Sequence, residues 1–145
     1  MYSFSVTVDI DAPPARVWRA LCDPAEVVQW DAGVEEALDA PSDYPRPGQH
    51  VRWRYSTGPF RVLHDRPQQV EPGRTLRSLI SLGPLRLDET YTLDQRDGGC
   101  RLDAALDVRV AVPLLGLAIE RLYFGAQSRR TVGLSLQALK RHCEA

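Results

Sequence analysis

Hydrophobic and polar residues alternate at the start of the chain, over Tyr2–Ile10. A period of two places successive side chains on opposite faces of a strand, so this segment is predicted to be a strand with one buried and one wet face. Later stretches repeat the alternation or place hydrophobic residues on one strand face. The strands predicted in this way are an edge strand Val34–Leu38, then Val51–Tyr55, Phe60–Val70, Leu76–Leu82, Leu87–Leu93 and Cys100–Val112.

Three helices are predicted from other signals. Pro13 and Pro14 supply the fixed backbone torsions of a helix start, and Asp23 followed by Pro24 has the composition of a second start. The third helix, 114–143, has the only long period of three and four residues. Its stripe is hydrophobic or small at every position except Arg129, and consists of Leu115, Ala118, Leu122, Gly125, Arg129, Val132, Leu136, Leu139 and Cys143.

The order of these elements predicts the fold class. One strand is followed by two short helices, about six antiparallel strands and one long helix, and helices do not continue to alternate with strands. Asp97 with the two glycines after it forms the strongest hairpin turn, and Pro41–Gly48 is expected to be an exposed loop. We therefore expect one α+β domain over residues 1–145, with a curved antiparallel sheet around the last helix.

The strand Phe60–Val70 can be read in two registers. One register turns Phe60, Val62 and His64 toward the core, and the other turns Arg61, Leu63 and Asp65 inward. The first is preferred, and Pro67 is expected to mark an irregularity or an edge position.

Composition narrows the function classes. The net charge is −1, and a protein that binds nucleic acid normally carries a basic excess, so nucleic acid is not an expected partner. The longest hydrophobic run, 110–119, is too short to span a membrane, and the first residues do not form a signal peptide. Three cysteines without metal-ligand spacing are expected to be reduced thiols, which predicts a cytoplasmic location without a metal. No cofactor-binding motif occurs, so no cofactor is expected.

Three stretches carry a resemblance to a known superfamily. They are VTVDIDAPPARVWRALCDPAEVVQW (6–30), VEPGRTL (70–76) and YTLDQRDGGCRL (91–102), the last followed by the long strand and helix. The chain resembles the SRPBCC or START-like helix-grip superfamily, and in particular its polyketide cyclase/dehydrase-type members. The resemblance implies a helix-grip fold of about six to seven strands, with a cavity between the sheet and the C-terminal helix. The superfamily contains ligand carriers, cyclases, hydrolase-like enzymes and co-chaperone domains, so the resemblance is specific for fold and not for function.

The implied cavity would hold a small hydrophobic molecule, lipid-like or aromatic polyketide-like. Large inward side chains on the sheet face small residues on the helix, which suits a cavity but also a dense core. The residues expected to line a cavity are Trp30, Trp53, Tyr55, Val62, His64, Ile80, Glu89, Tyr91, Leu106, Ala118, Leu122, Gly125 and Arg129.

Two of these residues are candidates for catalysis. The alternation that buries Tyr91 also turns Glu89 inward, where a carboxylate must be paired, hydrogen-bonded or protonated. Arg129 would be its partner, either beside a ligand or in a purely structural ion pair. His64, if inward, could titrate near neutral pH, whereas His142 is expected to be a solvent group at the helix end.

Three functions are compatible with these features. The first is binding of a hydrophobic ligand, and the second is a cofactor-independent cyclase or dehydratase that uses the same cavity. The third is a protein-interaction module with a closed core. A monomer and a homodimer are both compatible with the sequence.

Overall fold

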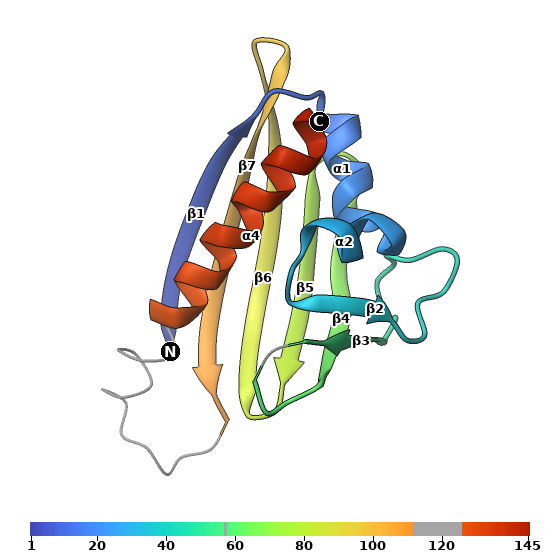
Figure 1. The fold of residues 1–145 in the computed structure, drawn as a ribbon, viewed down its shortest axis with the longest axis vertical. Coiled ribbons are helices and arrows are strands. Elements are labelled where there is room, and N and C mark those ends of the chain that lie inside the picture. Colours follow the sequence, from blue (N-terminus) through green and yellow to red (C-terminus); the bar gives the residue numbers. More distant parts are fainter. Residues whose placement is uncertain (57, 112–125) are drawn as a thin grey trace.

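The structure is a computed structural model that describes residues 1–56, 58–111 and 126–145. Seven antiparallel strands form one sheet in the order β1-β7-β6-β5-β4-β3-β2, with the helices on one face (Figure 1). This is the predicted α+β helix-grip arrangement. The strands are β1 (Tyr2–Ile10), β2 (Val34–Ala37), β3 (Val51–Tyr55), β4 (Val62–Glu71), β5 (Thr75–Leu82), β6 (Leu85–Arg96) and β7 (Gly99–Val110), and the helices are α1 (Pro14–Cys22), α2 (Pro24–Trp30) and α4 (Ala126–Glu144).

The hairpin between β6 and β7 is the longest in the sheet and follows the sequence prediction. Arg96 pairs with Gly99, which leaves Asp97 and Gly98 as a two-residue turn. Both turn residues have positive φ, 37° and 83°, as the turn that matches strand twist requires. The two strands consequently stay in regular register from this turn to the pair Leu85–Val110.

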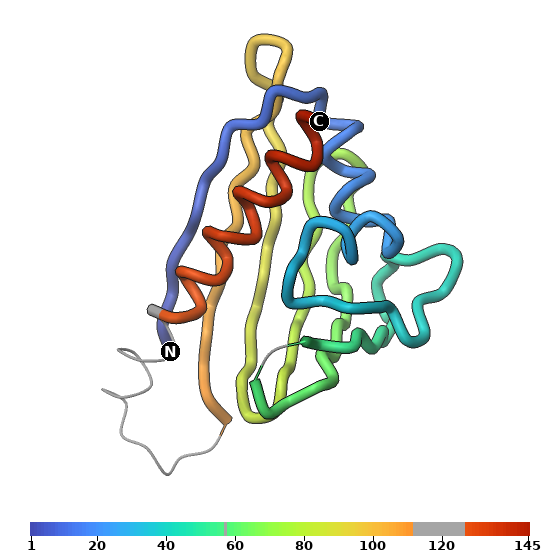
Figure 2. The backbone as a smooth tube through the Cα atoms, in the orientation of Figure 1, coloured from blue at the N-terminus to red at the C-terminus, as the bar shows by residue number. Residues whose placement is uncertain are grey.

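The two short helices begin where the sequence predicts. Pro14 is the first residue of α1, and Pro24 is the first residue of α2. The Asp23 side chain accepts a hydrogen bond of 3.0 Å from the Ala25 amide, which satisfies one of the unpaired N–H groups at a helix start. These helices lie beside the C-terminal end of α4 (Figure 2). The predicted long helix is present over Ala126–Glu144, and its part before Ala126 lies outside the described residues.

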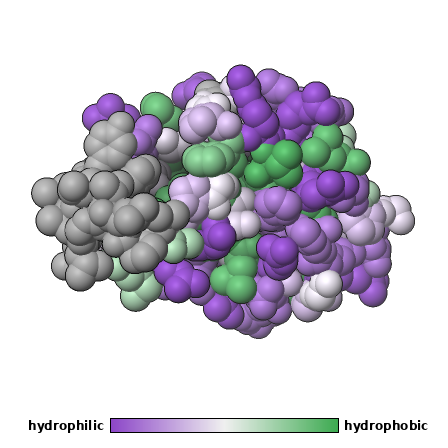
Figure 3. Space-filling model, turned by 90° about the horizontal axis from the view of Figure 1, so that it is seen from below, coloured by the Kyte–Doolittle hydropathy of each residue, from purple (hydrophilic) through white to green (hydrophobic). Residues whose placement is uncertain are grey.

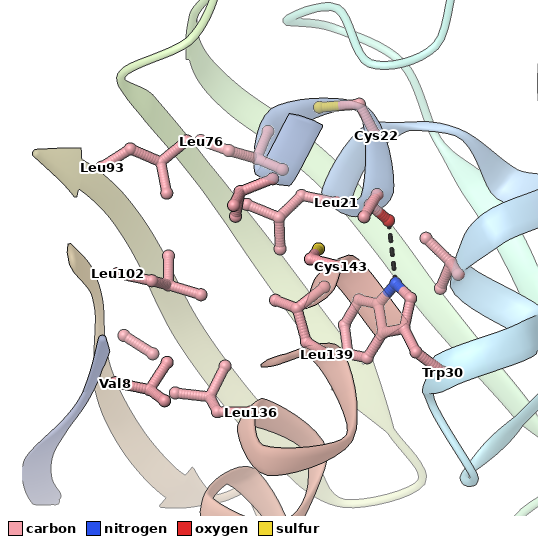
Figure 4. Packing of buried hydrophobic residues seen from close by; sticks show 14 of the residues in the cluster. Val8, Leu21, Cys22, Trp30, Leu76, Leu93, Leu102, Leu136, Leu139 and Cys143 are labelled. Atoms are coloured by element: carbon pink, nitrogen blue, oxygen red, sulfur yellow. Dashed lines mark hydrogen bonds between the residues drawn. The ribbon is translucent and has the colours of Figure 1, made fainter. Parts of the chain in front are cut away.

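The core lies between α4, the two short helices and the sheet (Figure 4). Leu136 and Leu139 of α4 are completely buried, and so is Leu102 of β7. The Trp30 indole also belongs to this core, because it is 5% exposed and its Nε1–H donates a 2.8 Å hydrogen bond to the Ala20 carbonyl. Each fully buried leucine contributes roughly 1.5–3 kcal/mol. Trp30 was predicted to line a cavity, but it lies in the packed core.

The Glu26 carboxylate connects the C-terminal end of α4 with the two short helices. Glu26 of α2 accepts hydrogen bonds from Arg16 at 2.7 Å and from Arg19 at 3.0 Å. His142 lies 2.8 Å from the same carboxylate through Nε2, and its side chain is 18% exposed. The expectation that His142 is a solvent group is wrong, because α2 brings a carboxylate to that helix end.

The preferred register of β4 is also wrong. Asp65 pairs with Val51 and with Ile80 and is 5% exposed, so it faces the core. Phe60, before the strand, is 43% exposed, and Val62 is 37% exposed. His64 pairs with outward residues and lies on the outer face with Val62. The hydrophobic gain of the other register is outweighed by hydrogen bonds that only an inward Asp65 can make.

Pro67 marks an irregularity in β4, as predicted. The register between β4 and β5 shifts between Pro67 and Gln69, which indicates a β-bulge. A proline removes a ladder donor, and a bulge is one of the few places where a sheet accommodates that loss.

Candidate functional site on the concave face of the sheet

The concave face is sealed on one side and accessible on the other. Inward side chains of β7 are closed off, with Leu102 at 0% and Leu106 at 2% exposure. Helix α4 crosses this side, in front of β1 and β7 (Figure 1). On β5 and β6, Leu76, Ser78 and Leu93 are buried as well, but the inward side chains closer to the β5–β6 turn remain half-buried. We call these residues the open concave face: Ile80, Leu82, Leu85, Leu87, Glu89 and Tyr91.

The open concave face changes from apolar to polar along β6. Leu85 and Leu87 lie toward the β5–β6 turn, and Glu89 and Tyr91 follow on the same face of the strand. Across the sheet, Glu89 lies between Ser78 and Leu106. A molecule on this face would therefore meet hydrocarbon at one end and hydrogen-bonding groups at the other.

Glu89 is the most perturbed acid of this face. Burial raises its pKa to about 8, and the charges of Asp65 and Asp31 act in the same direction. A hydrogen bond with Tyr91 opposes this shift, and burial together with the Glu89 charge raises the Tyr91 pKa well above its ordinary value. At neutral pH the Glu89 carboxyl is mostly protonated, so it can donate a hydrogen bond as well as accept one.

Asp65 anchors a second polar group at the end of the open concave face. Its Oδ2 accepts a 2.6 Å hydrogen bond from the Tyr44 hydroxyl and a 3.2 Å bond from the Trp53 indole. Within the described residues, no hydrogen bond of good geometry reaches Oδ1. Burial raises the Asp65 pKa, while Tyr44, Trp53 and the nearby Ser78 hydroxyl lower it. The result is a buried acid that also holds the loop carrying Tyr44.

Asp31, at the end of α2, is the third acid of a group that also contains Glu89 and Asp65. Its carboxylate accepts a 3.0 Å hydrogen bond from the Gly33 amide, and burial raises its pKa. Gly33 is required here because the Tyr55 ring occupies the place of a side chain, 2.7 Å from where a Cβ would stand. Tyr55 therefore closes one side of the site near Asp31.

Trp30 lies in the core, and the other predicted site residues divide into four groups. Tyr55, Ile80, Glu89 and Tyr91 lie on the concave face with accessible surface, whereas Trp53 and Leu106 are on that face but buried. Val62, His64 and Arg129 lie elsewhere, as described above for β4 and below for α4. Ala118, Leu122 and Gly125 lie outside the described residues.

Arg129 does not neutralise Glu89. It is exposed on α4, and its guanidinium lies 6.0 Å from the centre of the Phe4 ring. The predicted Glu89–Arg129 ion pair is wrong, since the described neighbours that set the Glu89 pKa are two acids and a tyrosine. Burial, followed by the charges of Asp65 and Asp31, therefore raises the pKa of Glu89.

Sequence reasoning missed Asp31, Asp65 and Tyr44 as members of the site. Asp65 faces the core only in the register of β4 that was not preferred. Asp31 and Tyr44 lie at a helix end and in a loop, where no periodicity indicates the direction of a side chain.

A sequence model of the family described as "Polyketide cyclase / dehydrase and lipid transport" matches residues 1–144. The chain belongs to this family. Among curated proteins there is no significant match. The family description names both chemical conversion and lipid carriage, so membership agrees with ligand binding but does not identify the ligand.

Solved structures of similar fold were found as well. CV1439 from Chromobacterium violaceum has a TM-score of 0.78 at 20% identity, with 99% of this chain and 97% of that chain covered. DynU16, from the dynemicin biosynthetic locus, has a TM-score of 0.72 at 22% identity, over 100% of this chain and 48% of that one. The Aha1 dimer from Colwellia psychrerythraea has a TM-score of 0.75 at 14% identity, with 99% and 97% covered. At these identities the likeness concerns the fold.

The described residues contain neither a membrane-spanning helix nor a cluster of metal ligands. No helix there has the length and hydrophobicity to cross a membrane. No group of three or more His, Cys, Asp or Glu there has metal-binding geometry. The three cysteines are unbridged and buried, and burial raises the pKa of Cys22 to about 12.

Proposed function

We propose that this chain binds a small hydrophobic molecule, lipid-like or aromatic polyketide-like, on the open concave face. The observation that carries the proposal is the contrast in burial across the sheet. Inward side chains on β7 from Leu102 to Val108 are closed off, whereas Leu87, Glu89 and Tyr91 on β6 retain accessible surface. Apolar surface left accessible beside a few polar groups is typical of ligand sites.

The proposed ligand has one polar end. Its body would cover Leu85 and Leu87, and its polar group would reach Glu89 and Tyr91. Because the raised pKa of Glu89 keeps its carboxyl protonated at neutral pH, a ligand carbonyl or hydroxyl fits there better than an anion. A carboxylate ligand would add a further negative charge beside Asp31 and Asp65.

Native mass spectrometry tests the proposal, after incubation with a lipid extract and with an aromatic polyketide-like probe such as an anthraquinone. Leu87→Trp is expected to fill the open concave face and reduce the retained ligand. Thr92→Trp is the matched control, because Thr92 lies on the other face of the same strand. No retained ligand, or equal retention by both variants, would contradict the proposal. The same spectra report whether the chain is a monomer or a homodimer.

A second candidate function is a cofactor-independent cyclase or dehydratase, and the Glu89–Tyr91 hydrogen bond favours it. A protonated acid with a pKa near the working pH can donate a proton to a carbonyl or a leaving hydroxyl. His64 has no place in this mechanism because it lies on the outer face. A retained molecule that loses water with the wild-type protein but not with Glu89→Gln would support catalysis. A molecule that both proteins return unchanged would leave binding as the function.

A further inference from the structure

Basic side chains form a continuous row across the outer face of the sheet. The register pairs Arg52 with His64, His64 with Ser81, Ser81 with Arg86, and Arg86 with Arg109. Five neighbouring strands thus contribute one residue each, and four of the five are basic. We call these five residues the basic row. At a strand spacing of about 4.8 Å, the row is roughly 19 Å long.

The row is unfavourable for the sheet itself. Arg86 and Arg109 are directly opposite each other, and like charges in such pairs destabilise a sheet. Arg52 is compensated by Asp39 at 2.8 Å, and Arg86 donates to backbone carbonyls of the β5–β6 turn. Within the described residues, neither Arg109 nor the neighbouring Arg66 forms an ion pair. Side chains that destabilise a fold are often found at functional sites, so the opposed Arg86 and Arg109 point to a function for the basic row.

The nearby acids offset the positive charge of the row only in part. Asp88 is engaged by Arg77 through two hydrogen bonds of 2.9 and 2.8 Å. Asp107 accepts a 2.6 Å hydrogen bond from Ser3. Positive potential therefore remains at the row, in agreement with the lowered pKa of His64, which burial and then the charges of His50 and Arg66 cause.

A depression of about 720 Å³ lies along the row. Its lining includes the basic residues His64, Arg66, Arg86 and Arg109, the acids Asp88 and Asp107, and hydrophobic side chains. Those side chains are unusually exposed, with Met1 at 61%, Leu79 at 39% and Val62 at 37%. Figure 3 views the end of the molecule near the β5–β6 turn and shows hydrophobic groups among hydrophilic ones there. The surface thus combines uncompensated cations with exposed hydrocarbon.

We propose that the basic row and this depression form a docking surface for an acidic amphipathic segment of a partner protein. A helix of about 13 residues has the length of the row, with acids toward Arg86 and Arg109 and hydrophobic residues toward Leu79. Nucleic acid fits poorly because the chain has a net charge of −1. A flat anionic membrane fits poorly because Arg66, Arg86 and Arg109 line a depression of about 720 Å³.

A synthetic helical peptide of about 15 residues, with Glu on one face and Leu on the other, tests the proposal by fluorescence anisotropy. Its control has Gln in place of Glu. The acidic peptide is expected to bind, and more weakly as salt rises from about 0.05 to about 0.3 M. The double variant Arg86→Glu/Arg109→Glu should raise Kd at least about tenfold. Arg74→Glu, an exposed cation in the β4–β5 turn, should change Kd less than about twofold.

Backbone amide NMR shifts of the unmodified protein provide a measurement that does not depend on variants folding. Shifts confined to His64, Leu79 and Ser81 would support the docking surface. Equal binding of the Gln peptide, no saturable binding, or binding unchanged by charge reversal would overturn it. Binding of phosphatidylglycerol vesicles through the same arginines, without peptide binding, would replace it with a membrane surface. Glu89→Gln, which alters the proposed ligand site at a residue outside the lining of the depression, should leave peptide binding unchanged, so the result is independent of the proposed ligand site.

Discussion

Glu89→Gln is expected to remove the pH dependence that Glu89 imposes on stability. The ordinary pKa of this carboxyl is 4.5, and in the folded protein it rises to about 8. Between these values the folded protein keeps a proton that the unfolded chain has released. The free energy of unfolding should therefore fall as pH rises, by about 1.36 kcal/mol per pH unit. This contribution is complete below pH 4.5 and is lost as pH rises through 8.

The variant carries a neutral amide of similar shape and lacks this dependence. From pH 5 to pH 8 the stability of Glu89→Gln relative to the wild-type protein should increase by roughly 4 kcal/mol. Urea unfolding of both proteins at several pH values measures this difference. Asp31 and Asp65 are present in both proteins, so their own pH dependence largely cancels in the subtraction.

Glu35→Gln, which removes an exposed carboxyl group on β2, is the matched control and should show no such trend. A relative stability of Glu89→Gln that changes by less than about 1 kcal/mol over this range would refute the reasoning. In that case Glu89 would ionise near its ordinary pKa, and water on the open concave face would solvate it. The proposed role of Glu89 as a proton donor would then be abandoned as well.

Two further predictions concern packing, and urea unfolding measures both. Leu136→Ala should lower the free energy of unfolding by about 2–5 kcal/mol because Leu136 is fully buried, whereas Leu134→Ala should change it by less than about 0.5 kcal/mol because Leu134 is 66% exposed. Gly83→Ala should cost at least about 2 kcal/mol, because Gly83 has φ +56° and a Cβ there would lie 2.5 Å from the Phe60 ring. In a Phe60→Ala background only the backbone cost of about 1 kcal/mol should remain, and an undiminished loss would contradict the contact.

The strand β4 shows where sequence reasoning reaches its limit. One register turns two hydrophobic residues and one ionisable residue inward, and the other turns one hydrophobic and two ionisable residues inward, so hydrophobic alternation favours the register that the structure does not have. The register depends on Tyr44, which donates to Asp65 from a loop far away in the sequence. Such a hydrogen bond is a property of the folded chain and has no local pattern.

The position of Glu89 could be predicted from the local sequence, but its pKa could not. The alternation along β6 places it on the concave face, as the structure does. Its electrostatic surroundings follow from tertiary structure, because Asp31 and Asp65 come from other elements and Arg129 points elsewhere. The raised pKa therefore could not be predicted together with the position.

The sequence by itself determined the order of strands and helices, the hairpin at Asp97–Gly98 and the starts of the short helices at Pro14 and Pro24. These features depend on backbone preferences and on periods of two or 3.6 residues, which act over a few positions. Tertiary structure alone decided the β4 register, the acidic group around Glu89 and the basic row. Each of these joins residues from strands or loops that are distant in the chain, and the pairing register between them sets which side chains meet.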